Sequence, residues 1–168
     1  MCIERNYFYS GAGDIFKIRI YKFTNQIYMS SGNTKQQYPN LAVEFLSRVW
    51  GPDHELDAID ELMTEDYFIV TGGKTIEGRT NFKNWVREFQ QVLLDARTIS
   101  QDSFISEDGS KIVSRWICSG RNNGIFGLKA DGKAVSFTGI AIWQVRHNRL
   151  SACWVERSAL ELFKELSA

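Results

Sequence analysis

The stretch KAVSFTGIAIWQVRHNRLSACWVER, residues 133–157, contains two strand-like segments, 133–145 and 149–157, joined by a short His-Asn turn. β-Branched and aromatic residues are typical of strands, and so short a turn joins antiparallel neighbours. Gly139 falls in the middle of the first segment, where glycine often marks a bend or a close approach by a ligand or by backbone. The stretch therefore predicts a strongly curved sheet with a ligand-binding hollow on its concave side.

Strand and helix patterns extend outward from this stretch. Two more strand-like segments, 98–106 and 111–120, precede it, and Asp-Gly turns separate the consecutive strands. The strongest helical pattern, 79–95, carries apolar residues at three- and four-residue spacing, which indicates one buried stripe. The other expected elements are helices over 41–50, 56–63 and 159–166 and a strand over 66–71. Helices first and strands after indicate an α+β layered fold with a curved antiparallel sheet.

The chain divides into an N-terminal extension, 1–38, and a main domain, 39–168, because regular periodicity begins only at Pro39. Within the extension, 15–23 alternates well enough to be a strand. One hypothesis is that Met29 is the true start and that the upstream residues are a mis-assigned extension. The rival hypothesis is that they form a real additional strand at a sheet edge.

Composition excludes several classes of protein. The 168 residues include 20 Lys+Arg and 20 Asp+Glu, so the net charge is zero and we expect no nucleic-acid partner. No apolar run reaches the length of a membrane span, and the N-terminus lacks the order of a signal peptide, so we expect no membrane association and a cytoplasmic location. The three cysteines form no CxxC pair and the chain has two histidines, so we expect no metal site.

Large aromatic side chains from several segments are expected around the hollow. Most of them form core, and two or three contact a ligand. With Gly139 and Ser158, the predicted pocket residues are Trp50, Tyr67, Trp85, Phe89, Phe126, Phe137 and Trp154, and Trp116 belongs to the same aromatic group.

Two charged residues on strand segments are candidates for chemistry. Glu156 shares a strand face with Trp154 and Ala152, and Arg115 alternates with apolar neighbours. A charge on an apolar face needs a partner, because an unpaired buried charge is costly. Glu156 is the candidate base of a pocket, with a pKa raised by burial, and Arg115 is the candidate anion or carbonyl clamp. The structural alternatives are an ion pair, a solvated rim position or an interface arginine.

Several strings, in this order and at this spacing, resemble the SnoaL-like polyketide cyclases, or ester cyclases, of the nuclear transport factor two-like superfamily. The strings are LAVEFLSRVW (41–50), IDELMTEDYFIV (59–70), EGRTNFKNWVREF (77–89), DGSKIVSRWICSG (108–120), GIFGLKADGKAVSFTGIAIWQV (124–145) and LSACWVERSALELFKEL (150–166). The resemblance implies a cone-shaped α+β fold with an internal hydrophobic cavity for a small molecule. It also implies a homodimer through the convex sheet face. Cyclases of this group close a ring by an aldol step, with acid–base residues and without metal or cofactor.

The catalytic residues of the family do not carry over. The cyclase pattern places an Asp four residues after a Trp near the C-terminus, and here Ser158 stands at that distance from Trp154. Serine does not titrate near neutral pH, so the acid–base role is empty. The family's Gly-Thr-His-x-Gly turn has Asn122 in place of its His. The ketosteroid isomerases place a base Asp near the turn after the first strand, where this chain has Val-Thr-Gly at 70–72.

Three functions remain open from the sequence. The first is a cyclase or isomerase that moves a proton on a hydrophobic carbonyl compound, with Glu156 as base and Arg115 or Arg121 stabilising the enolate. The second is a pocket protein that holds an apolar metabolite or pigment without chemistry. The third is a dimerisation module whose pocket is vestigial.

Overall fold

The computed structural model describes residues 19–23, 26–30 and 40–168. It contains two compact units, Met1–Gln37 and Tyr38–Ala168. In the first unit, strands β1 (Arg19–Phe23) and β2 (Gln26–Ser30) pair antiparallel in a sheet of their own. The proposed start at Met29 falls within β2, and the start of the predicted 15–23 strand lies outside the described residues.

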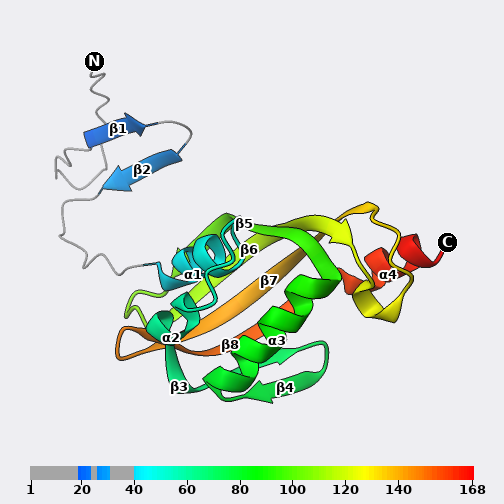
Figure 1. The fold of residues 1–168 in the computed structure, drawn as a ribbon. Helices are drawn as coiled ribbons and strands as arrows, with labels where there is room; N and C mark the ends of the chain where they lie inside the picture. The colour runs from blue at the N-terminus through cyan, green and yellow to red at the C-terminus, as the bar shows by residue number, and fades with distance from the viewer. Residues whose placement is uncertain (1–18, 24–25, 31–39) are drawn as a thin grey trace. The chain divides into compact units, whose positions relative to one another are not determined.

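The second unit carries four helices and one six-stranded sheet (Figure 1). The sheet order is β4-β3-β8-β7-β6-β5, and it is antiparallel except that β3 runs parallel to β8. In chain order, the elements of the second unit are α1 (Leu41–Val49), α2 (Ala58–Leu62), β3 (Met63–Thr71), β4 (Lys74–Glu77), α3 (Arg79–Val92), β5 (Leu93–Ile105), β6 (Lys111–Asn122), the 3₁₀ turn η1 (Ile125–Gly127), β7 (Ala134–Arg146), β8 (Arg149–Arg157) and α4 (Ala159–Ser167). The predicted α+β fold with a curved sheet is confirmed.

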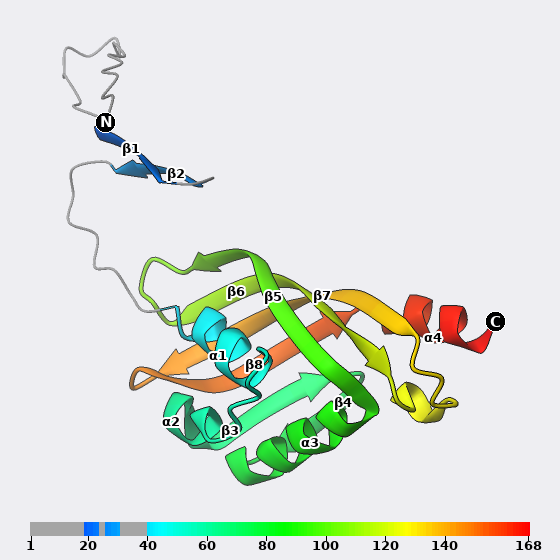
Figure 2. The same ribbon diagram turned by 45° about the horizontal axis from the view of Figure 1, so that its top comes forward.

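Helices α1 and α3 cover one face of this sheet (Figure 2). Helix α1 begins at Asn40, whose side-chain oxygen accepts a hydrogen bond from the Val43 backbone N–H at 3.2 Å. This cap satisfies one of the free donors at the helix start. Helix α3 buries Phe82 and Val86 completely, so the predicted apolar stripe faces the sheet. The sequence placed the end of this helix at residue 95, but β5 already begins at Leu93.

The inner face of the sheet, which the helices cover, follows from strict alternation in β7. Val135, Phe137, Ala141 and Trp143 are buried, whereas the residues between them are exposed. Gly139 is also buried, and the Trp116 ring of β6 occupies the space where a side chain of residue 139 would lie. A Cβ at Gly139 would lie 2.2 Å from Cζ2 of that ring and 2.8 Å from the backbone oxygen of Glu156. Only a residue without a side chain fits at this position.

We expect Gly139→Ala to lower the free energy of unfolding by about 1–3 kcal/mol, because the added methyl group forces the Trp116 ring or the β8 backbone to move. Chemical denaturation measures this loss. Ser136→Ala, at an exposed position of the same strand, is the control and should change stability by less than about 0.5 kcal/mol. Equal stabilities of the two variants would show that the contact at Gly139 is not tight.

Candidate functional site

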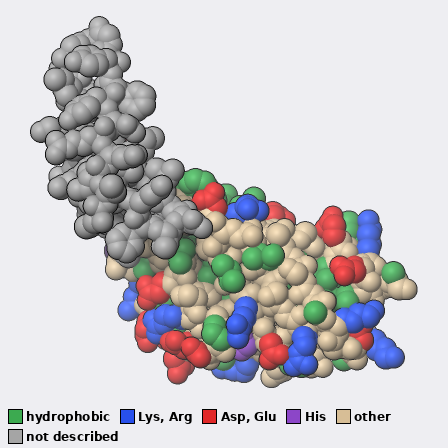
Figure 3. All heavy atoms as spheres, turned by 90° about the horizontal axis from the view of Figure 1, so that it is seen from above, with side chains coloured by type: hydrophobic (Ala, Val, Ile, Leu, Met, Phe, Trp, Pro, Cys, Tyr) green, Lys and Arg blue, Asp and Glu red, His purple; other side chains and the backbone are tan. Residues whose placement is uncertain are grey.

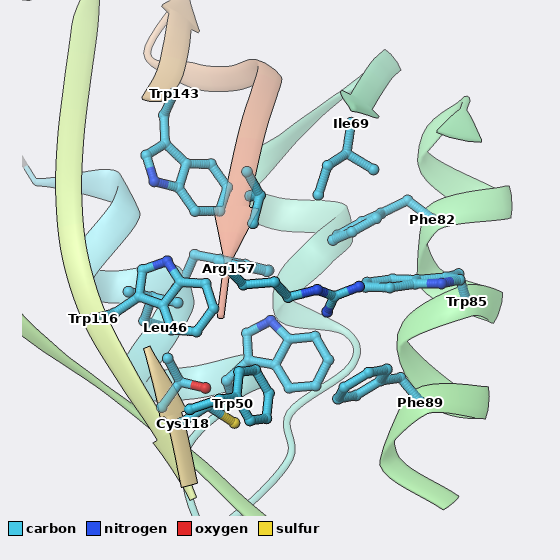
Figure 4. Close-up of a pocket in the computed structure, with 14 residues that line it drawn as sticks. Leu46, Trp50, Ile69, Phe82, Trp85, Phe89, Trp116, Cys118, Trp143 and Arg157 are labelled. Atoms are coloured by element: carbon cyan, nitrogen blue, oxygen red, sulfur yellow. The ribbon is translucent and has the colours of Figure 1, made fainter. Parts of the chain in front are cut away.

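A cavity lies between the inner face of the sheet and helices α1 and α3 (Figure 4). It is partly open to solvent and has a volume of about 60 Å³. The helical side contributes Phe45, Leu46, Trp50, Phe82, Trp85 and Phe89. The strands contribute Ile69, Thr98, Trp116, Cys118, Phe137, Trp143, Val155 and Arg157.

Aromatic rings form most of the cavity wall, and they hold one another in place. Trp50 meets Phe89 edge to face with ring centroids 5.6 Å apart, and Trp85 lies 5.5 Å from the same ring. On the sheet side, Trp116 meets Phe137 edge to face at 6.1 Å. Such pairs add stability beyond burial alone, and their faces offer flat apolar surfaces to a ligand ring.

Arg157, the last residue of β8, extends its side chain across this cavity toward Trp85 (Figure 4). Its guanidinium carbon lies 5.5 Å from the centroid of the Phe89 ring, a cation–π contact. Burial lowers the pKa of Arg157, and among the described residues the single titratable group that acts on it is the thiol of Cys118. The cavity therefore contains a positive charge that no carboxylate of the described chain neutralises.

A thiol and a hydroxyl lie near this arginine in the cavity wall. Cys118 in β6 and Thr98 in β5 are directly paired across the two strands, and both are buried. Burial raises the pKa of the Cys118 thiol, although a hydrogen bond with Thr98 and the charge of Arg157 act in the opposite direction. The thiol therefore stays protonated at neutral pH and serves as a weak donor, not as a nucleophile.

A β-bulge decides which residue of β8 enters the cavity. Near the β7–β8 turn, Val145 pairs with Leu150, but the pairing then shifts by one residue, at Ser151. Because of this shift, Gly139 lies opposite Arg157. Without it, Gly139 would lie opposite Glu156, because a shift of one residue exchanges the two faces of a strand. The bulge thus turns Arg157 inward and Glu156 outward.

The structure distributes the predicted pocket residues over different environments. Four of them line the cavity: Trp50, Trp85, Phe89 and Phe137. Tyr67 is fully buried beside the cavity and packs on Phe82, with ring centroids 4.9 Å apart. Gly139 does not line the cavity, but it leaves the space that the Trp116 ring of the lining occupies.

Three other predicted pocket residues lie outside the lining. Phe126 is 40% exposed and contacts Phe163 of α4. Trp154 lies on the outer face of the sheet, where it meets Phe68 edge to face. Ser158 precedes α4, and its hydroxyl accepts a hydrogen bond from the Thr138 backbone N–H at 3.1 Å.

Glu156 and Arg115 are both exposed on the outer face, where they flank Ile140 on either side in the sheet. The cavity lining includes neither residue, so the structure does not bring them together with the aromatic walls. Their catalytic roles stay predictions from the sequence. Sequence reasoning missed Arg157, and the one local signal for it was its alternation with Val155 and Cys153.

The described part of the chain contains neither a metal-binding cluster nor a membrane-spanning helix. No group of three or more His, Cys, Asp or Glu side chains in residues 19–23, 26–30 and 40–168 is arranged to hold a metal ion. None of the described helices is both long and apolar enough to cross a membrane.

A helix-covered, curved sheet around an aromatic cavity defines an α+β protein of the fold shared by the SnoaL-like proteins and the ketosteroid isomerases. The family model of the SnoaL-like polyketide cyclases matches residues 40–166, and the chain belongs to this family. No curated protein matches the sequence.

Solved structures show the same fold. A protein from Jannaschia sp. CCS1 assigned as a SnoaL-like polyketide cyclase superimposes with a TM-score of 0.69 at 14% identity, covering 82% of this chain and 99% of that one. TsrD from Streptomyces laurentii gives 0.65 at 24% identity, with 76% and 92% covered. A protein of ketosteroid isomerase-like fold from Catenulispora acidiphila gives 0.64 at 12% identity, with 78% and 95% covered.

Proposed function

We propose that this protein binds a hydrophobic, ring-containing carbonyl compound in the aromatic cavity. The observation that carries the proposal is the cavity itself, whose lining is mostly aromatic and which is partly open to solvent. Mostly apolar cavities with a few convergent polar groups are the usual sites for small ligands. Here the convergent groups are Thr98, Cys118 and Arg157. The fold and the family support the same function.

We expect Val155→Phe to abolish binding of a neutral aromatic probe, N-phenylnaphthylamine, because the added ring fills the cavity from its β8 wall. Probe fluorescence and quenching of the cavity tryptophans measure the binding. Val43→Phe makes the same change on α1 outside the lining, at an exposed position, and should bind the probe like the wild type. Equal binding by both variants would place the probe elsewhere on the protein.

A second candidate function is proton transfer of the cyclase or isomerase type on such a carbonyl compound. Arg157 favours it, because a preorganised cation in a poorly solvated site stabilises the negative oxygen of an enolate. Among the described residues, the lining contains no aspartate, glutamate or histidine that would take the proton. The proton would therefore leave to solvent at the open side of the cavity. The sequence had favoured Glu156 for this role.

Exchange of α-protons of a ring ketone in deuterated water, followed by NMR, tests this activity. We expect Arg157→Met to slow the catalysed exchange on the order of a hundredfold, through loss of enolate stabilisation. Glu156→Gln should leave the rate unchanged, because this carboxylate lies on the outer face. A slow Glu156→Gln variant would instead support Glu156 as the base and contradict solvent as the proton acceptor.

The outer face of the sheet supports a further part of the proposal, a homodimer. A row of apolar side chains crosses five strands on this face: Phe104, Val113, Ile142, Trp154 and Val70 are neighbours in register. Phe104 is 62% exposed and Ile142 is 42% exposed. Figure 3, which views the molecule from above, shows scattered hydrophobic side chains on a surface that is mostly neither charged nor hydrophobic. Exposed apolar patches of this kind mark association surfaces.

We expect the wild type to be a dimer in light scattering coupled to size-exclusion chromatography, and Ile142→Asp to be a folded monomer. The aspartate places a charge in the apolar row, where association would remove it from water. Leu160→Asp, at a position on α4 that is 58% exposed, is the matched control and should stay dimeric. A monomeric wild type would contradict the dimer.

A further inference from the structure

Arg157 differs from the ion-paired cations of the described chain in its partners. Arg48 contacts three glutamates, and Lys83 contacts two aspartates, each at 2.7 Å. Arg121 and Arg146 each pair with one aspartate. These ion pairs lie at the surface, where water already stabilises a charge. Arg157 is half-buried in the cavity wall, yet the one partner recorded for its guanidinium among the described residues is the Phe89 ring.

A purely structural role explains this placement poorly. A guanidinium that leaves water needs both an opposite charge and hydrogen-bond acceptors, because desolvation costs several kcal/mol. A cation–π contact returns only about 0.5–2 kcal/mol. Arginines that serve as packing usually extend along the surface and keep the charged end in water. Arg157 instead extends across the cavity toward Trp85, into the space that a ligand would share (Figure 4).

The surroundings of Arg157 are suited to a negative oxygen. The lining holds no acidic side chain among the described residues, so nothing there competes for the guanidinium or repels an anion. Thr98 and Cys118 add a hydroxyl and a protonated thiol, both of which donate hydrogen bonds. Guanidinium groups present parallel N–H donors that match a carboxylate, and such charge-assisted bonds are among the strongest in proteins.

We propose that the natural ligand is an aromatic acid whose anionic oxygen pairs with Arg157 while its ring contacts the aromatic lining of the cavity. The anionic group is a carboxylate or an ionised phenol or enol. This inference rests on the proposed small-molecule function and deepens it, because it adds a required negative charge to the hydrophobic ring system. Arg157 is then the residue that selects acids over neutral compounds of the same shape.

Two probes that share one ring system separate charge from shape. Anilinonaphthalene sulfonate carries an anionic group, and N-phenylnaphthylamine has the same rings without it. Both are titrated by fluorescence into the wild type and into Arg157→Met, Arg157→Lys and Arg87→Met. Arg87 is exposed on α3 and contacts Asn84, so its variant removes one positive charge without touching the cavity.

We expect Arg157→Met to weaken binding of the anionic probe by roughly ten- to a hundredfold, the loss of one strong charge-assisted contact. Binding of the neutral probe should change by less than about threefold, since methionine keeps an apolar stem of similar length. Arg157→Lys should retain part of the anion binding because it keeps the charge. Arg87→Met should behave like the wild type with both probes.

The outcomes distinguish failure of this inference from failure of the proposed function. Wild-type protein that binds neither probe overturns both. Wild type that binds both probes, with Arg157→Met weakening them equally or not at all, overturns the anion site alone and leaves the cavity as a neutral pocket. Thermal unfolding of each variant confirms folding, and Arg157→Met should unfold at the same temperature as the wild type or higher, because it removes an unneutralised buried charge.

Discussion

The contact between the Trp116 ring and the bare Cα of Gly139 governs the interior of this protein. The indole lies where a side chain of β7 would otherwise stand, with its ring atoms closer to that position than any Cβ allows. Because the glycine adds no volume of its own, the sheet face has room here for one large ring and for the Arg157 side chain opposite. Glycine is required at this position for the space it leaves, since its backbone has no positive φ.

Much of the fold follows from local patterns, and the face of Glu156 shows where such patterns stop. The alternation in 133–145 and the spacing in 79–95 predict β7 and α3, because each depends on neighbours in sequence. Which residue of β8 points into the cavity, however, depends on how β8 pairs with β7 across the turn. A regular hairpin would place Glu156 opposite Gly139, whereas the one-residue shift at Ser151 places Arg157 there. A bulge of one residue leaves no clear signature in composition, so the sequence alone does not predict that Arg157, and not Glu156, lies on the cavity side of β8.

The aromatic walls were easier to anticipate than the polar groups. Trp85 and Phe89 lie four residues apart on a strongly amphipathic helix, which directs both toward the sheet wherever the sheet lies. Phe126 and Trp154 are equally large, yet η1 and the outer face hold them away from the cavity. No local sequence pattern separates Trp85 and Phe89, which line the cavity, from Phe126 and Trp154, which do not. The parallel pairing of β3 with β8, which positions Ile69 in the wall, is likewise a long-range feature that periodicity does not encode.

The same arrangement changes the chemistry that the family fold supports. With Ser158 engaged by the β7 backbone and Glu156 turned outward, the described cavity lining contains no carboxylate and one cation, Arg157. A site of this kind acts through its electric field, since a fixed positive charge among aromatic rings stabilises a negative oxygen without itself exchanging a proton. If the proposed anionic ligand binds, its pairing with Arg157 offsets the cost of removing this guanidinium from water. In that proposal one interaction, between Arg157 and the ligand, supplies both stability and selectivity.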